Sequence, residues 1–160
     1  MSMRILLLVF VALTPSLGRA TEPATLIATD VECYDAEVSA RIMAQIPSIP
    51  PEFDDGSIVM RWPWFIDLDV RKVRDGEAPT GMVSTLAVQH TYWRSDLGVT
   101  RWYLRRNSQG GFNLLGRAKG GELPLCAPDT PPAHPYLGTD DATMLEALRL
   151  EGEERYGRRR

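Results

Sequence analysis

Two histidines are the first side chains in this sequence to consider for catalysis. On an extended strand His90 would share one face with Val88 and Tyr92. A catalytic base needs a nucleophile within hydrogen-bonding distance, and the sequence alone does not place one beside His90. We therefore favour a partly buried, structural His90 over a catalytic one. His134 lies among prolines and is expected in an exposed loop.

A pair of carboxylates, Asp67 and Asp69, is the second candidate, because residues two apart on a strand point to the same side. Such pairs can perform acid–base chemistry or bind a hard cation. However, the two aspartates alternate with Ile66 and Leu68, as on an ordinary solvated strand face. We favour that interpretation and expect no metal or cofactor. The alternative is a hydrolase built around His90, Asp67 and Asp69.

An aromatic and basic cluster between positions 62 and 106 is the third candidate. It comprises Trp62, Trp64, Tyr92, Trp93, Arg94, Arg101, Trp102, Tyr103, Arg105 and Arg106. Tryptophans on alternating strand positions usually form a barrel core, with arginine stems packed around it. The other interpretation is a ligand or partner surface, which we assign to Trp62, Trp93, Arg94, Arg101, Tyr103 and Arg105. The formal charge of −3 argues against nucleic acid as the ligand.

Most sequence signatures of catalysis are absent. The sequence contains no G-x-S-x-G, no H-E-x-x-H, no P-loop and no C-x-x-C motif. These absences argue against most kinds of enzyme.

The first twenty residues predict export. Arg4 precedes nine apolar residues (5–13), and the segment ends in Gly18-Arg19-Ala20, so we expect a signal peptide cleaved after Ala20. A membrane anchor would need about 20 apolar residues. A periplasmic or secreted protein is therefore expected, with no stable membrane anchor after cleavage.

The two cysteines are interpreted in the light of this export signal. Cys33 and Cys126 form an even pair, and an oxidising compartment favours one intramolecular disulfide between them. A redox-active pair would more often be spaced as C-x-x-C, and metal binding by two distant thiols is disfavoured.

Five extended segments separated by turn residues would position these side chains. They cover residues 36–46, 64–70, 82–93, 99–105 and 112–115 and predict an antiparallel sheet or small barrel. In the first segment Val38, Ala40, Ile42, Ala44 and Ile46 are expected on one face, although its alanines would also suit a helix. A helix is expected to follow near the C-terminus, with Met144, Leu145 and Leu148 as its apolar stripe and Arg149 outside.

The order of these segments resembles the netrin-like and metalloproteinase-inhibitor branch of the OB fold. The likeness covers residues 30–116 and includes the basic turn Arg74-Asp75-Gly76-Glu77 and Gly98 with Trp102-Tyr103-Leu104. It implies an OB-like barrel. Inhibitors of that family approach a catalytic metal with a cysteine at the mature N-terminus. This chain would begin at Thr21, so inhibition is not carried over.

These observations predict a mainly β protein with a small, OB-like antiparallel barrel of about five strands. The expected parts are a signal peptide (1–20), a β-barrel domain (21–122), a proline-rich arm (123–138), a C-terminal helix (139–157) and a frayed basic tail (158–160). We expect a binding or interaction module whose partner is an envelope protein or a glycan.

Overall fold

The computed structural model describes residues 33–50, 59–117, 123–139 and 141–160. The predicted signal peptide lies outside these residues. The described chain forms β1 (Ala36–Pro47), β2 (Trp62–Gly76), β3 (Gly81–Gln89), a short 3₁₀ helix η1 (Ser95–Leu97), β4 (Val99–Arg106), β5 (Phe112–Arg117) and α1 (Ala142–Tyr156).

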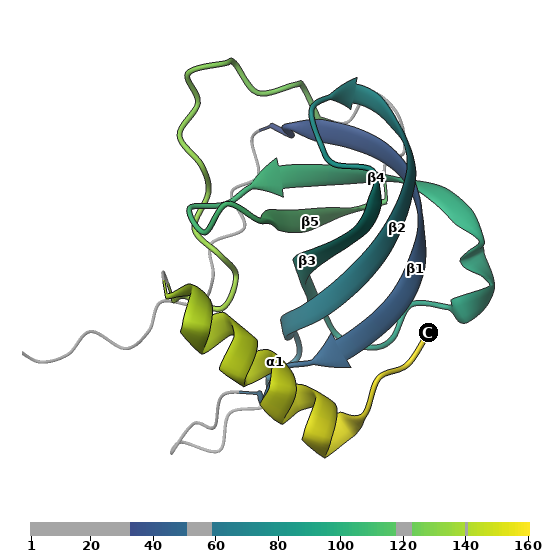
Figure 1. Cartoon of the computed structure of the whole chain (residues 1–160), viewed down its shortest axis with the longest axis vertical. Helices are drawn as coiled ribbons and strands as arrows, with labels where there is room; N and C mark the ends of the chain where they lie inside the picture. Colours follow the sequence, from purple (N-terminus) through teal and green to yellow (C-terminus); the bar gives the residue numbers. More distant parts are fainter. Residues whose placement is uncertain (1–32, 51–58, 118–122, 140) are drawn as a thin grey trace, which may run out of the picture.

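The five strands close into a barrel in the order β1-β2-β3-β5-β4, and β4 pairs back onto β1 (Figure 1). This arrangement confirms the predicted mainly β, five-stranded barrel with a C-terminal helix. All strand pairs are antiparallel except β3 and β5, which are parallel and share only the pairs Thr85–Phe112 and Leu86–Asn113. The barrel wall is therefore weakest between β3 and β5.

Alternating residues fill the barrel interior. Trp64, Ile66, Leu68 and Val70 of β2 all face the core, as their spacing predicts. Small residues on β1, among them Ala40, leave room for the two largest side chains inside the barrel, Trp64 and Trp102. The indole Nε1 of Trp102 donates a hydrogen bond of 3.2 Å to the Ala40 carbonyl.

The predicted single apolar face of β1 is wrong in its second half. A register shift between Ile42 and Ala44 inserts an extra residue, which inverts the alternation that follows. Gln45 consequently bonds to the main chain of Trp93, while Ile46 joins a separate cluster outside the barrel. That cluster comprises Ile46, Phe65, Leu86 and Tyr136, with Leu145 and Leu148 of α1 packed against it.

The proline-rich arm is fastened to the barrel as expected. A disulfide joins Cys33 to Cys126, and the main chains beside it pair as a parallel bridge between Tyr34 and Leu125. Tyr34 N donates to the Pro124 carbonyl at 3.0 Å, and Cys126 N donates to the Tyr34 carbonyl at 2.7 Å. The disulfide indicates an oxidising, non-cytoplasmic compartment.

Helix α1 lies across one side of the barrel (Figure 1). Its N-cap is Asp141, whose carboxylate accepts the N–H groups of Thr143 and Met144. Two expectations about its faces are wrong, because Met144 is 51% exposed and Arg149 turns toward the barrel. No helix in the described part of the chain is long and apolar enough to cross a membrane.

Close contact between α1 and β1 depends on Gly152, the buried glycine of the helix. A Cβ atom at this position would lie 2.3 Å from the Pro47 carbonyl oxygen. A glycine therefore allows the helix to approach the strand at this point.

The sequence suggested a frayed tail for the three C-terminal arginines, and this prediction is wrong. Gln45 N donates to the Arg159 carbonyl at 2.6 Å, and Arg159 N donates to the Gln45 carbonyl at 3.3 Å. The Arg159 guanidinium lies 4.7 Å from the centre of the Tyr92 ring. The end of the chain is thus held against the edge of β1 beyond Arg41, where the pairing with β4 ends.

Candidate functional site

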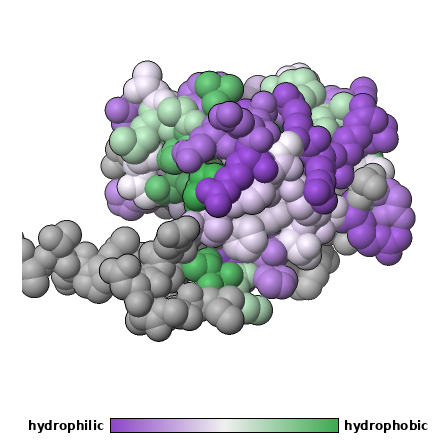
Figure 2. Space-filling view, turned by 90° about the horizontal axis from the view of Figure 1, so that it is seen from below, coloured by the Kyte–Doolittle hydropathy of each residue, from purple (hydrophilic) through white to green (hydrophobic). Residues whose placement is uncertain are grey.

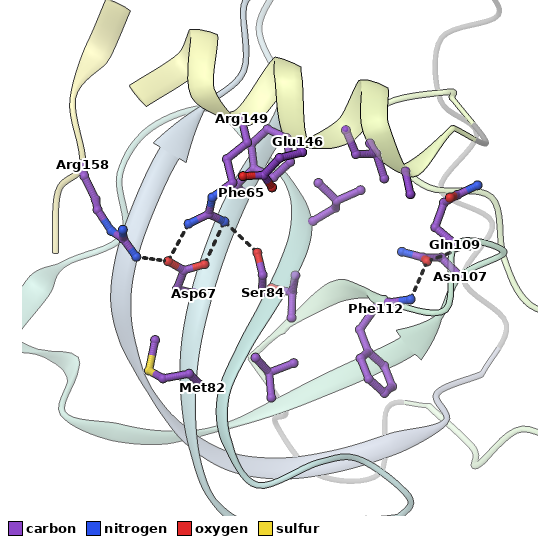
Figure 3. A pocket seen from close by; sticks show the side chains of 16 residues that line it. Phe65, Asp67, Met82, Ser84, Asn107, Gln109, Phe112, Glu146, Arg149 and Arg158 are labelled. Atoms are coloured by element: carbon purple, nitrogen blue, oxygen red, sulfur yellow. Dashed lines mark hydrogen bonds and ion pairs between the residues drawn. The ribbon is translucent and has the colours of Figure 1, made fainter. Parts of the chain in front are cut away.

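A groove of about 470 Å³ lies between α1 and the outer faces of β2 and β3 (Figure 3). The loop between β4 and β5, with Asn107 and Gln109, closes its far end. The groove combines one charged end with an apolar floor, and we take it as the candidate functional site.

Asp67 and Arg149 form the charged end. Arg149 binds the Asp67 carboxylate in a bidentate manner, with Nη1 to Oδ1 at 2.9 Å and Nη2 to Oδ2 at 2.8 Å (Figure 3). Arg158 adds a contact of 2.5 Å to Oδ2. The side chains of Asp67 and Arg149 are only 5% and 14% exposed, so this ion pair is shielded from solvent.

The local structure explains how these groups meet. Asp67 points away from the core because its neighbours Ile66 and Leu68 point into it. Ser84 lies directly opposite Asp67 on β3. Its hydroxyl accepts a hydrogen bond of 2.7 Å from Arg149 Nη1. A hydrogen bond from the Ser84 side chain also helps to lower the pKa of Asp67, so the Ser84 proton is engaged by that carboxylate.

The charge state of Asp67 follows from its surroundings. Burial by itself raises the pKa of Asp67, but the hydrogen bonds and charges of Arg149 and Arg158 outweigh burial and lower this pKa below its usual value. Hydrogen bonding to Asp67 raises the pKa of Arg149. The pair is therefore fully ionised at neutral pH and holds α1 on the barrel. A carboxylate held in this way is a poor general base.

Apolar side chains form the floor of the groove. Phe65, Leu86 and Phe112 are buried in the barrel wall, and Leu145 of α1 faces them. The β4–β5 loop at the far end is fixed by Asn107. Its Oδ1 accepts the N–H groups of Gln109 and Gly111, at 3.2 and 3.1 Å.

The main chain of β3 has an open edge at this groove. Residues Gly81 to Ser84 pair with β2 on one side, whereas pairing with β5 on the other side begins only at Thr85. No strand in the described ranges therefore covers the second side of Gly81–Ser84. Met82 on this edge is 60% exposed. An unpaired strand edge presents a row of N–H and C=O groups to a partner.

The residues of the hydrolase hypothesis do not meet in one pocket. His90 is exposed, where partial burial was expected, and its Nδ1 lies 2.5 Å from the Met60 carbonyl oxygen. His90 lines a second pocket, on a different part of the surface from the groove that Asp67 lines. Asp69 is paired with Arg71 instead.

The aromatic members of the predicted surface are separated by the fold. Tyr103 is buried and stacks on Tyr34 with the ring centres 4.5 Å apart. Trp62 and Trp93 are half-buried and pack against the barrel core. On the face seen in Figure 2, hydrophobic residues occur in small groups between hydrophilic ones.

The basic members of that surface are engaged in ion pairs. Arg94 pairs with Asp96, Arg101 with Glu37 and Arg105 with Asp35. Tyr103 and Arg105 are shielded from solvent, so the six residues do not form one continuous exposed patch. Among the described residues, no group of three or more His, Cys, Asp or Glu side chains is placed to hold a metal ion.

Sequence reasoning missed Ser84, Arg149 and Arg158. A signal for Arg149 was present, because it lies four positions after Leu145 and hence on the same helix face. Arg158 is 91 positions from Asp67 and Ser84 is in a different strand, so no local pattern connects them with this carboxylate.

Comparison with protein-family models, with curated proteins and with solved structures found no match to this chain.

Proposed function

We propose that this protein is a binding module that holds an extended segment of a partner protein in the groove between α1 and β3. The observation that carries the proposal is the open edge of Gly81–Ser84, which borders the groove. Extended peptides add to such edges through main-chain hydrogen bonds and gain specificity from pockets for alternate side chains.

The dimensions and chemistry of the groove define the partner segment. Four edge residues span about 13 Å, which matches a short extended stretch of peptide. An apolar side chain of that stretch would rest on the floor at Phe112 and Leu145.

Two features support the proposed compartment of the module. The disulfide supports an oxidising environment, and the predicted leader supports export to the periplasm or beyond. An envelope protein is therefore the proposed partner.

Peptide selection followed by mapping tests this function. A phage-displayed library of random 12-residue peptides would be selected on the oxidised protein lacking residues 1–20. A selected peptide should bind with slowed amide hydrogen exchange within Gly81–Ser84, because the N–H groups of the alternate residues that point to the open side would gain strand partners. Protection confined to another strand would contradict the proposal.

Two tryptophan substitutions on the same helix provide a matched comparison. Ala142 lines the groove, whereas Ala147 is exposed elsewhere on α1. Ala142→Trp should obstruct the groove and weaken peptide binding at least tenfold by calorimetry. Ala147→Trp should leave the affinity within about twofold, since side chains outside the contact contribute little. Equal effects of the two variants would refute the assignment of the groove.

A further inference from the structure

A second pocket opens where the barrel wall divides. Strands β3 and β5 share only two residue pairs and then separate, and both strands beyond those pairs contribute to the lining. The volume of this space, which we call the seam pocket, is about 410 Å³, within the range of roughly 300–1,000 Å³ typical of small-molecule sites. The seam pocket is distinct from the groove under α1, since the two share no lining residue.

The inner walls of the seam pocket suit a hydrocarbon chain. They consist of apolar side chains that are buried or half-buried, namely Val88, Trp93, Leu114 and Leu115. A Cβ atom at Gly116 would meet no atom within 4 Å outside its chain neighbours, so the space beside this glycine is open. Gln89 also lines the pocket, but its amide atoms are buried out of reach of a ligand. Apolar contact therefore dominates the interior.

One of these walls is held rigidly. Trp93 packs on Trp102 with ring centres 5.0 Å apart. Its main chain is bonded at both ends to the Gln45 side chain, with Trp93 N to Oε1 at 2.8 Å and Nε2 to the Trp93 carbonyl at 3.0 Å. A fixed indole supplies apolar contact area with little loss of conformational entropy on binding.

Polar and basic side chains form the mouth of the seam pocket. Arg61 and His90 flank the last residue pair between β2 and β3, so they lie side by side where the two strands end. Thr91 follows His90, and all three residues are exposed. Arg61 Nη2 donates to the Val88 carbonyl at 3.0 Å, which leaves other N–H groups of the guanidinium for a ligand.

The positive charge at the mouth has no carboxylate beside it. None of the described residues that line the seam pocket is acidic. Arg61 also forms no ion pair with any residue in the described ranges. An anionic group at the mouth would gain charge-assisted hydrogen bonds, while an attached apolar chain would be removed from water inside.

We propose that the seam pocket binds a hydrocarbon chain that carries an anionic head group. The chain would lie between β3 and β5 against Trp93, and the head group would accept hydrogen bonds from Arg61 and Thr91. A free fatty acid and an anionic phospholipid share this chemistry. The site is independent of the peptide groove and of its proposed function.

Calorimetry on the oxidised protein tests the proposal, with octanoate, decanoate, 1-octanol and dihexanoyl phosphatidylglycerol as probes below their micelle concentrations. Decanoate should bind about fifteenfold more tightly than octanoate, because each buried methylene contributes roughly fourfold. The uncharged 1-octanol should bind about tenfold more weakly than octanoate. No binding of either acid, equal affinities of the two acids, or equal binding of octanoate and 1-octanol would overturn the proposal. Tighter binding of decanoate than of the phospholipid would identify a fatty acid as the source, and the reverse would identify a lipid.

Arg61→Gln separates recognition of the head group from the fold. Octanoate affinity should fall about tenfold or more, whereas 1-octanol affinity and the urea midpoint should stay unchanged. Arg155→Gln is the matched control, since Arg155 is exposed on α1 outside the pocket. It should leave octanoate affinity within about twofold. An equal effect of Arg61→Gln on both ligands would overturn the assignment of the head-group site.

Two tryptophan substitutions test the location. Thr91→Trp should obstruct the mouth and weaken octanoate binding at least tenfold, whereas Thr80→Trp, at an exposed residue outside the pocket, should not. Ala142→Trp, which obstructs the peptide groove, should leave octanoate binding unaltered. A loss of octanoate binding in Ala142→Trp would place the ligand in that groove and overturn the proposal.

Discussion

Replacing Asp67 by alanine tests the charged end of the groove most directly. The substitution leaves Arg149, which is 14% exposed, without its bidentate partner. Removing one member of a buried ion pair typically costs about 3–5 kcal/mol, because the other charge stays buried and uncompensated. The contact to Arg158 adds at most about 1 kcal/mol, since that side chain is 52% exposed. We therefore expect a loss of roughly 3–5 kcal/mol.

Urea unfolding of the oxidised protein measures this loss. With a slope of about 2 kcal/mol per molar, the midpoint should fall by about 2 M. Asp69→Ala is the matched control, because Asp69 lies on the same strand and pairs with the exposed Arg71. It should cost no more than about 1 kcal/mol. A loss below about 1 kcal/mol for Asp67→Ala as well would refute the claim that the ion pair is buried.

A double substitution measures the interaction between Asp67 and Arg149 separately from the effect of losing either side chain alone. Asp67→Leu combined with Arg149→Leu should be less destabilising than Asp67→Leu alone, because replacing a whole buried pair by apolar residues is often neutral or stabilising. Additive losses in this cycle would show that the two side chains do not interact.

Acid removes the same carboxylate charge without a mutation. The pKa of Asp67 is lowered in the folded protein, whereas the unfolded value is about 3.9. The stabilisation is therefore complete above about pH 5 and decreases as the pH falls through 3.9 toward the lower, folded pKa. Asp67→Asn should flatten this part of the stability–pH profile. An unchanged slope in the variant would assign the acid sensitivity to other groups.

Three further variants test the framework around the site. Gly152→Ala should destabilise the protein and loosen α1, because the new Cβ would lie 2.3 Å from the Pro47 carbonyl oxygen; faster amide exchange in α1 would report it. Replacing Cys33 and Cys126 by alanine should cost up to about 4–5 kcal/mol in urea unfolding, since the disulfide closes a loop across 93 positions. Asp141→Ala should lower stability by about 1 kcal/mol in thermal unfolding, because two N–H groups lose their cap; no change would contradict the capping role.

Much of the barrel was predictable because strand alternation is a local property. The spacing of Trp64, Ile66, Leu68 and Val70 identified the inner face of β2, and that face is indeed buried. The same rule failed in β1, where the irregularity between Ile42 and Ala44 inverts the pattern. Such an irregularity depends on how β1 pairs with its neighbour, so the sequence of one strand does not reveal it. The likeness to netrin-like domains and the signal peptide stay predictions.

The candidate site was far less predictable than the fold. Asp67 was interpreted as solvated because only its neighbours on the strand were visible in the sequence. Its burial comes from α1, which supplies Arg149 from 82 positions away. The open edge of β3 likewise follows from the short pairing with β5, which is a property of barrel closure.

The sequence by itself determined the strands, the capped helix and the pair of cysteines, because alternation, capping and cysteine number act over short distances or need no geometry. Only the tertiary structure decided which charges are buried together and where the barrel wall opens. Those features depend on contacts between segments far apart in the chain, whose meeting is fixed by packing.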